Sequence, residues 1–473
     1  MTRDFQAARR YLVRGRVQDV AYRDFARRMA DALGVTGYVR NLDDGRVEVY
    51  AVGAPDKLSA LRAALRKGPH LSDVRGVDER EAAAQHYSDF QIIRQHPDRE
   101  SCELLCAIVR RPADARQIDR LAGSVRDWDS LVTLAREHRV LPLLFSRLAD
   151  LGSAVPPAAQ ERLRAEYQRE AARNLANASE LIGLLKAFHH EGIPAMPFKG
   201  VVLGASIYGD LTTRPAGDLD VLIHYRHLLR ATAVLLQMGY ELKTPVHPDG
   251  TPAAPRCSEY QFTRQADGMV VEVRWRLDLA GGFRRNLGMD WVWQWRRTAM
   301  LAGAEVPNLS PEITLLVLCM HGSKHSWSRL IWICDVAQLL AAFPGLDWTE
   351  ITQEAKRVGL WRTLALGVLL ARRVAGAAVP QAVLHSFESD TTACSLAGHF
   401  QQTLFDWPLC PPPGRIPYAI LLLGFHDRVR LLLSLDRWRP NEKDRAAVHL
   451  PQSLEALYYL VHPVRLLWDR LAR

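Results

Sequence analysis

Three acidic residues in the middle of the chain have the types and the spacing of a metal site. Asp218 and Asp220 lie two residues apart in GDLDVLI, whose strand pattern puts both carboxylates on one face. Glu272 lies between apolar residues in a second strand-like segment, VVEVRWRL, where a carboxylate needs a partner. Adjacent carboxylates repel each other unless a cation lies between them, and hard oxygen ligands suit Mg²⁺. We therefore expect these three residues to bind Mg²⁺. The alternative is a strand-entry turn and an exposed edge glutamate.

Two further groups of residues have types that suit phosphate. Lys199 and Gly200 follow a short apolar segment and precede a helical pattern, which predicts a phosphate-binding turn with Lys199 as a point charge. His321 and His325, in HGSKHSW, share one face of a helix and lack the glutamate of a zinc protease motif. For this pair we expect a scaffold role, with a metal or phosphate contact as the alternative.

A loop near the N-terminus, VRGRVQDVAYR, has the pattern of an anion cradle. Backbone N–H groups in a turn before a helix form an anion nest, and Arg23 adds a planar charge that can hold two phosphate oxygens. Asn41, at the end of the next strand, is neutral and can hold a water molecule. This combination suits hydrolysis of a phosphate ester or anhydride without a metal. The alternative is that Gly15 is only a bulge and Arg23 a solvated helix residue.

The elements that must position these residues follow from hydrophobic periodicity. Residues 1–94 alternate strand and helix patterns in the order βαββαβ, with strands at 11–17 and 89–94, helices at 24–34 and 57–69, and a hairpin at 38–53. Residues 101–190 are helix-rich, 193–300 form a short α/β segment, and the chain after 310 is mostly helical. We expect an α+β protein with domains at 1–94, 101–345 and 346–473, the last a helical region without a recognisable motif.

Composition excludes several classes of protein. The 473 residues suffice for two to four domains, and no 18-residue apolar run is free of charge, so we expect no membrane span. The seven cysteines form no CxxC pair and the first residues lack an apolar signal region, which favours a reducing cytoplasm. The net charge of +9 suits anionic ligands such as nucleotides, with nucleic acid as the weaker candidate.

In order and spacing, VRGRVQDVAYR, LGVTGYVRN, DDGRVEVYAVG, KGPHLSDV and DFQI resemble the acylphosphatase family over about residues 8–94. The resemblance implies a ferredoxin-like fold and hydrolysis of acyl phosphates with no cofactor. It implies that Arg23 binds the phosphate and that Asn41 orients the attacking water. The phosphate loop would comprise Gly15, Arg16, Val17, Gln18, Asp19 and Val20. The family usually has glycine where this chain has Asp19, and phenylalanine where it has Tyr22. Repulsion of about 1 kcal/mol between Asp19 and the phosphate predicts weakened activity.

The glycine turn, the DxD strand and the single acidic residue on a later strand resemble the polymerase-β-like nucleotidyltransferase superfamily. More narrowly, residues 103–345 resemble an uncharacterised bacterial nucleotidyltransferase family through KG, YGD, RPAGDLDVLI, MGYEL, VVEVRWRL and HGSKHSWSRLIWICDVAQLL. This resemblance implies two metal ions held by Asp218, Asp220 and Glu272, with Gly200 near the nucleotide phosphates. Val201 replaces the serine that commonly follows the glycine, and Arg274 replaces a histidine.

These features predict a multidomain enzyme with two modules. The first hydrolyses acyl phosphates, and the second uses Mg²⁺ to transfer a nucleotidyl group from an NTP to an unidentified acceptor. Two alternatives stay open, because folds do not by themselves prove activities. In one, a single module is active and the other is scaffold. In the other, the chain is a non-catalytic nucleotide- or RNA-binding protein.

Overall fold

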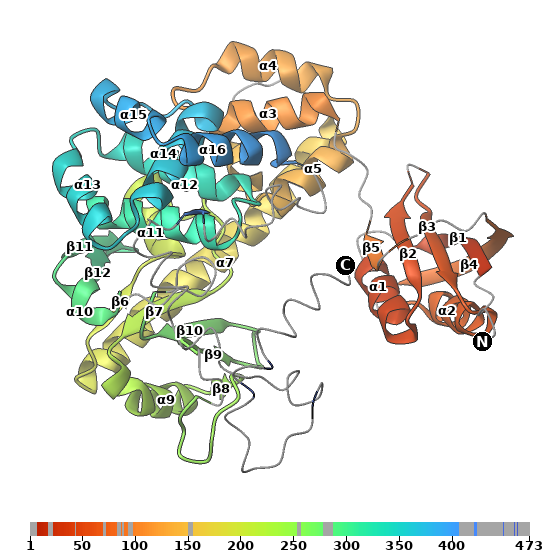
Figure 1. The fold of residues 1–473 in the computed structure, drawn as a ribbon, viewed down its shortest axis with the longest axis horizontal. Coiled ribbons are helices and arrows are strands. Elements are labelled where there is room, and N and C mark those ends of the chain that lie inside the picture. The colour runs from red at the N-terminus through yellow and green to blue at the C-terminus, as the bar shows by residue number, and fades with distance from the viewer. Residues whose placement is uncertain are drawn as a thin grey trace. The chain divides into compact units, whose positions relative to one another are not determined.

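The computed structural model describes residues 7–17, 22–42, 44–69, 72–82, 87, 89–92, 98–149, 155–252, 257–277 and 287–405, together with residues 421, 422, 448, 458 and 461. The chain divides into two compact units (Figure 1). The first comprises Met1–Cys102 with Thr403–Cys410, and the second comprises Glu103–Gln402 with Pro411–Arg473. Within the described residues, none of the helices combines the length and the apolar character of a membrane span.

The first unit is a five-stranded sheet packed against two helices. Its elements are β1 (Ala7–Arg16), α1 (Tyr22–Leu33), β2 (Thr36–Asn41), β3 (Val47–Gly53), α2 (Pro55–Lys67), β4 (Asp73–Glu81) and β5 (Phe90–Ile92). The strand order is β4-β1-β3-β2-β5, and β5 lies parallel to β2. The first four strands with the two helices give the ferredoxin-like βαββαβ arrangement, which confirms the predicted fold class for this unit.

One strand of this sheet escaped the sequence prediction. The fourth strand of the βαββαβ unit is β4, whereas the predicted closing strand at 89–94 corresponds to β5, a fifth strand on the other edge. Strand β4 reads DVRGVDERE and buries only Val77, so its apolar alternation is weak. Its charged side chains suit an exposed edge, where they discourage pairing with other chains.

Buried tyrosines join the helices to the sheet in the first unit. Tyr22 at the start of α1 is buried, and its hydroxyl donates a 2.5 Å hydrogen bond to the carbonyl of Leu65 at the end of α2. Tyr11 on β1 donates in the same way to the carbonyl of Leu58 over 3.0 Å. The hydroxyl that distinguishes Tyr22 from phenylalanine therefore ties the two helices together.

The second unit begins with helices and continues into a mixed sheet. The helices are α3 (Arg99–Val109), α4 (Ala115–Ser124), α5 (Trp128–Glu137), α6 (Leu141–Leu148) and α7 (Pro157–His190). The sheet strands are β6 (Ala195–Pro197), β7 (Leu219–Ile223), β8 (Glu241–Leu242), β9 (Glu259–Thr263) and β10 (Val270–Arg274). Their order is β6-β7-β10-β9-β8, and β7 and β10 run parallel. Apolar residues of α7 and of α9 (Leu228–Gln237) pack with this sheet in one core.

Short elements and a second helical group complete the unit. The short elements are α8 (Val201–Leu203), a π-helical turn at Gly204–Tyr208, a 3₁₀ turn at Tyr225–His227, α10 (Met289–Trp293) and the hairpin β11 (Arg296–Leu301) and β12 (Ala304–Leu309). The helices are α11 (Pro311–Lys324), α12 (Leu330–Ala342), α13 (Trp348–Arg357), α14 (Trp361–Ala375), α15 (Gln381–Glu388) and α16 (Thr391–Thr403). Helix α14 packs against both α11 and α12. The helical character predicted after residue 310 is confirmed for the described residues, whereas the hairpin was not predicted.

Candidate functional site

Two parallel strands bring the three predicted acidic ligands together. Asp220 on β7 and Glu272 on β10 are directly paired in the strand register, and Asp218 lies immediately before β7. One carboxylate oxygen from each of these residues lies within 4.8 Å of the others. Side chains at alternate positions of a strand share a face, so the period-two spacing of Asp218 and Asp220 aims both toward Glu272. The residues therefore have the donor atoms and the proximity of a metal site, and their role as ligands stays a prediction.

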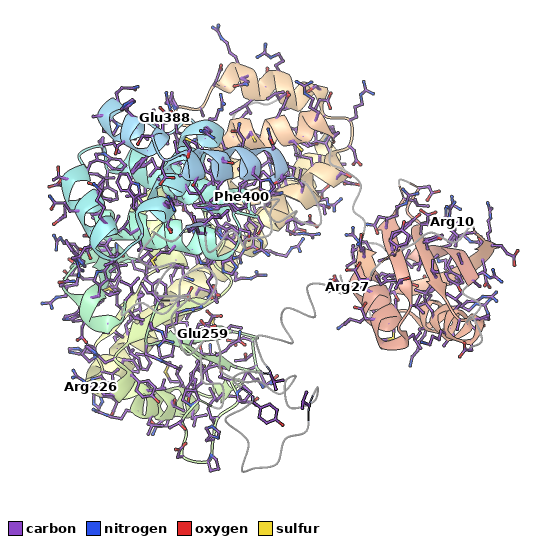
Figure 2. The ribbon with its side chains drawn as sticks, in the orientation of Figure 1. Arg10, Arg27, Arg226, Glu259, Glu388 and Phe400 are labelled. Carbon is purple, nitrogen blue, oxygen red and sulfur yellow. The ribbon has the colours of Figure 1, made fainter. Side chains whose placement is uncertain are left out.

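Two cations of the protein itself neutralise part of this cluster. The Lys199 ammonium lies 2.8 Å from Oδ2 of Asp220, and Nε of Arg274 donates to Oδ1 of Asp220 over 3.0 Å. The Arg274 guanidinium also pairs with Glu272 and with Glu259, which lies on β9 and is labelled in Figure 2. Each oxygen of Asp220 thus accepts from a different cation, and charge-assisted contacts of this kind hold the buried carboxylate in one orientation.

The carboxylates respond differently to this environment. Burial raises the pKa of Asp218 and of Glu272, and the negative charge of Asp220 raises the pKa of both further. Burial would also raise the pKa of Asp220, but Lys199 and Arg274 outweigh it and hold that pKa below its ordinary value. Asp220 is therefore ionised, and repulsion from its negative charge disfavours the ionised forms of Asp218 and Glu272. A divalent cation would relieve that repulsion, and three carboxylates are the hard oxygen donors that Mg²⁺ prefers. The donor set fits the predicted metal.

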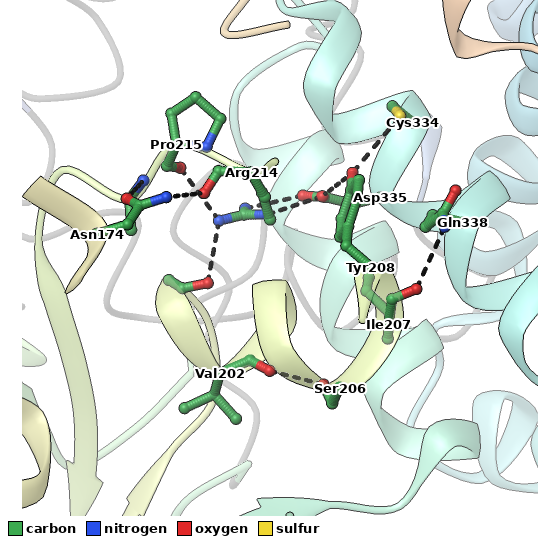
Figure 3. A network of polar contacts seen from close by, with 12 residues as sticks. Asn174, Val202, Ser206, Ile207, Tyr208, Arg214, Pro215, Cys334, Asp335 and Gln338 are labelled. Carbon is green, nitrogen blue, oxygen red and sulfur yellow. Dashed lines mark hydrogen bonds and ion pairs between the residues drawn. The ribbon is translucent and has the colours of Figure 1, made fainter. Parts of the chain in front are cut away.

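The turn that carries Lys199 touches the start of β7. Gly200 has φ 64° and ψ −132°, a backbone conformation that L side chains rarely adopt, and a Cβ there would lie 3.3 Å from the carbonyl oxygen of Asp218. Val201 is buried in the core, so the position of the expected serine is used for packing. The next hydroxyl, Ser206, donates to the carbonyl of Val202 over 2.7 Å within its own helical turn (Figure 3). Lys199 is the charged group that this turn offers.

The predicted N-terminal site is described in part. Asn41 lies at the end of β2, and its Oδ1 is buried and accepts no hydrogen bond from the described residues. Since buried polar atoms normally have partners, this oxygen suits a bound water. Arg23 lies in the first turn of α1. Arg16 is the last residue of β1 and Val17 is buried, whereas Gln18, Asp19 and Val20 lie outside the described residues.

Gly15 is required by the geometry of the sheet. It lies at a β-bulge where the β1–β4 register shifts, with φ +125°, and a Cβ would come within 2.0 Å of the carbonyl oxygen of Asp73. The alternative interpretation was that this glycine is only a bulge; the strand geometry shows the bulge and leaves a role in phosphate binding as a prediction. A bulge at the end of β1 also turns the chain toward the loop that follows, so it does not exclude a place in the phosphate loop.

Comparison with known proteins assigns both units to families. Residues 124–376, more than half of the chain, match the family model described as an uncharacterised nucleotidyltransferase. The chain belongs to this nucleotidyltransferase family. Residues 9–92 match the acylphosphatase family model. An acylphosphatase of Solibacter usitatus is 66% identical over 85 residues, which are 18% of this chain and 88% of that protein. The N-terminal unit is therefore a member of the acylphosphatase family, and both families are named for enzymes.

Two solved structures complete the comparison. An acylphosphatase from Coxiella burnetii is 35% identical, over 19% of this chain and 93% of that one, with a TM-score of 0.18. The lincomycin-bound lincosamide antibiotic adenylyltransferase LnuA is 16% identical, over 35% of this chain and 96% of that one, with a TM-score of 0.25.

In the nucleotidyltransferase unit, a buried ion pair that the sequence interpretation missed positions the acidic strand. Nε and Nη2 of Arg214 donate to the two carboxylate oxygens of Asp335, each over 2.8 Å, and the Tyr208 hydroxyl donates to the same carboxylate over 2.8 Å (Figure 3). Nη1 of Arg214 lies 3.4 Å from the carbonyl oxygens of Gly200 and Pro215. Helix α12 therefore anchors both the Gly200 turn and the loop that leads into Asp218.

Helix α7 holds the same loop from another side. The amide nitrogen of Asn174 donates to the carbonyls of Leu211 and Arg214, and its Oδ1 accepts from the Ala216 N–H over 3.0 Å. A signal for these positioning residues was present in the sequence. Asp335 is the single carboxylate in the apolar run LIWICDVAQLL, and a buried carboxylate in such a helix needs a cation. The identity of that cation depends on tertiary structure.

Proposed function

We propose that this chain is a two-module enzyme. Its acylphosphatase domain hydrolyses acyl phosphates, and its nucleotidyltransferase domain transfers a nucleoside monophosphate from an NTP to an acceptor with Mg²⁺. Nucleotidyl transfer is supported above all by one observation: three carboxylates lie within 4.8 Å of one another beside the Lys199–Gly200 turn. Domains at 1–94, 101–345 and 346–473 and a cytoplasmic location belong to the same proposal.

In the nucleotidyltransferase domain, Asp218, Asp220 and Glu272 would hold the metal. Bound Mg²⁺ supplies positive charge at the transferring phosphoryl group and aligns the attacking and leaving oxygens. Lys199 stands beside Asp220 and offers a point charge to the phosphate chain. The acceptor hydroxyl oxygen forms a bond to the α-phosphorus and gives up its proton to solvent. The bond between the α-phosphorus and the oxygen that bridges it to the β-phosphorus breaks, and pyrophosphate leaves with that oxygen.

In the acylphosphatase domain, the proposed chemistry uses no metal. The loop of residues 15–20 and Arg23 bind the phosphate, and Asn41 orients a water molecule through its buried Oδ1. Water adds to phosphorus, the bond between phosphorus and the acyl oxygen breaks, and a carboxylate and inorganic phosphate leave. The high identity to an acylphosphatase over nearly the whole domain supports this assignment.

The nucleotidyltransferase proposal is tested by following the α-phosphate. The full chain is incubated with Mg²⁺, cell extract and each NTP labelled at the α-phosphate, and the labelled product is identified. Asp218→Asn should abolish labelling, because it removes one of the three ligands. Asp267→Asn is the matched control, since this carboxylate lies in the exposed turn before β10 and pairs with Arg264. Equal labelling by the wild type and Asp218→Asn would contradict the assignment.

The acylphosphatase proposal is tested by hydrolysis of benzoyl phosphate in EDTA. Arg23→Ala should remove the activity because the phosphate loses its bidentate partner. Arg27→Ala on the exposed side of the same helix is the control and should keep it. Activity in only one of the two assays would support the single-activity alternative. NTP binding without pyrophosphate release or benzoyl phosphate hydrolysis would support the non-catalytic one.

A further inference from the structure

A basic pocket lies next to the acidic cluster and has no role in the proposal so far. Its cavity volume is about 50 Å³, and it is lined by Phe198, Lys199, Arg274, Leu277, Val317, Met320, His321, Lys324 and His325. A cavity needs roughly 10–15 Å³ to hold a single water, so this one has room for a larger group such as a phosphate. Five of the nine lining residues are basic, and none is acidic.

Packing fixes the end of α11 that supplies three of these basic groups. Trp327 is buried with φ +51°, and its backbone N–H donates to the Gly322 carbonyl over 2.8 Å. A Cβ on Gly322 would lie 2.5 Å from the Trp327 ring, so the glycine makes room for the indole. The left-handed turn after α11 is therefore held by a buried side chain, and the residues just before it have fixed positions.

The two histidines are held against one tryptophan. The ring centroids of His321 and His325 are 4.7 Å apart, and His325 stacks on Trp332 at 5.1 Å. Within the described residues, no hydrogen bond or ion pair engages the side chains of His321, Lys324 or His325. By contrast, Lys199 and Arg274 line the pocket and also contact Asp220. The pocket thus presents basic groups that lack a carboxylate partner.

The charges that line the pocket favour an anion over a cation as its occupant. Burial lowers the pKa of His321 and of His325, and neighbouring cations, including Lys199 for both, lower each pKa further. A metal ion bound between the two imidazoles would face Lys199, Arg274 and Lys324 within one small pocket. An anion would gain charge-assisted contacts from the same groups. The geometry and the charge therefore agree on an anionic ligand.

We propose that this pocket binds the terminal phosphates of the donor nucleotide, the part that leaves as pyrophosphate. This inference deepens the proposed function and rests on it for the identity of the donor. Lys199 and Arg274 lie between the carboxylates and the pocket, so a phosphate chain that runs past them places its terminal groups near His321, Lys324 and His325. When the bond between the α- and β-phosphates breaks, the electron pair stays on the pyrophosphate, whose added charge the pocket stabilises.

The test measures pyrophosphate binding to the full chain by calorimetry in EDTA, so that no metal contributes. All proteins carry Arg23→Ala, because the proposed acylphosphatase site would itself bind phosphate. Lys324→Glu reverses an exposed charge at the pocket and should weaken binding at least tenfold. Lys186→Glu is the matched control, since it makes the same charge change on an exposed face of α7 and should stay within twofold. His325→Gln should also weaken pyrophosphate binding. It replaces a neutral imidazole by a neutral amide, so the net charge of the pocket stays the same.

The outcomes separate this inference from the proposed function. Equal binding by the Lys324→Glu and Lys186→Glu proteins, or no binding by their parent, would overturn the pocket assignment. Asp218→Asn should preserve metal-free pyrophosphate binding while abolishing nucleotidyl transfer. If pyrophosphate binds as expected and no NTP labels any acceptor, the pocket inference stands as a polyphosphate site and the transferase proposal fails.

Discussion

The buried pair of Arg214 and Asp335 leads to a prediction with a calculable size. Asp335 is fully buried and Arg214 is 6% exposed, so neither charge is solvated by water. Asp335→Asn keeps the shape of the side chain but leaves the Arg214 guanidinium without a compensating charge. Breaking a buried ion pair in this way costs about 3–5 kcal/mol. The Tyr208 hydroxyl also loses a charged acceptor, which works in the same direction.

Calorimetry of the full chain can measure this loss with an internal control. The two units should unfold in separate transitions, and only that of the nucleotidyltransferase unit should move. In a domain of this size each kcal/mol shifts Tm by roughly 2 °C, so we expect a fall of about 6–10 °C. The acylphosphatase transition should stay in place, because the variant lies in the other unit.

A double variant separates the charge effect from packing. Arg214→Met with Asp335→Leu buries no charge, and replacing a buried pair by apolar residues is often neutral in free energy. This protein should recover most of the lost stability. It should still show weaker nucleotidyl transfer than the wild type, because methionine cannot replace the contact of Arg214 Nη1 with the carbonyl of the Gly200 turn. A loss below about 1 kcal/mol in Asp335→Asn, or a double variant less stable than the single one, would refute the reasoning.

Three further predictions concern single residues. Gly15→Ala should destabilise the acylphosphatase transition alone, because its Cβ meets the Asp73 carbonyl at 2.0 Å; an unchanged Tm would contradict the bulge geometry. Asp220→Asn should abolish NTP-dependent pyrophosphate release in saturating Mg²⁺, since it removes the central carboxylate; wild-type release would exclude the metal assignment. Asp19→Gly should raise kcat/KM for an acyl phosphate about fivefold by removing about 1 kcal/mol of repulsion, less at high salt. An unchanged rate would mean that the carboxylate points away from the phosphate.

The sequence predicted local features well where one segment carried the whole signal. The spacing of Asp218 and Asp220 placed both on one side of a strand, and the helix patterns of the first unit located α1 and α2. The pairing of β7 with β10 brings Glu272 beside Asp220, although they are 52 positions apart in the sequence. Periodicity alone does not determine which strands become neighbours, so the resemblance to a known layout was needed there.

The features that escaped prediction depend on contacts between distant segments. The cation that neutralises Asp335 comes from a residue 121 positions earlier, and nothing local to either residue names the partner. Strand β4 pairs at an exposed edge and therefore lacks the apolar alternation that marks a half-buried strand. The ion pairs of Asp220 with Lys199 and Arg274 likewise depend on tertiary structure, because the Lys199–Gly200 turn and β10 are distant in the sequence.

Under the proposed function, the contacts of Asp220 with Lys199 and Arg274 make metal binding and phosphate binding parts of one linked equilibrium. A divalent ion can use the oxygens of Asp220 fully only after Lys199 or Arg274 releases them, and a phosphate chain gives both cations another partner. A bound phosphate thus draws the two cations away from Asp220, and a bound metal ion frees them for phosphate. Thermodynamic reciprocity requires that each ligand raise the other's affinity by the same factor. A site built in this way would bind free Mg²⁺ weakly and the magnesium–nucleotide complex well. It would stay neutralised by its own side chains until substrate arrives.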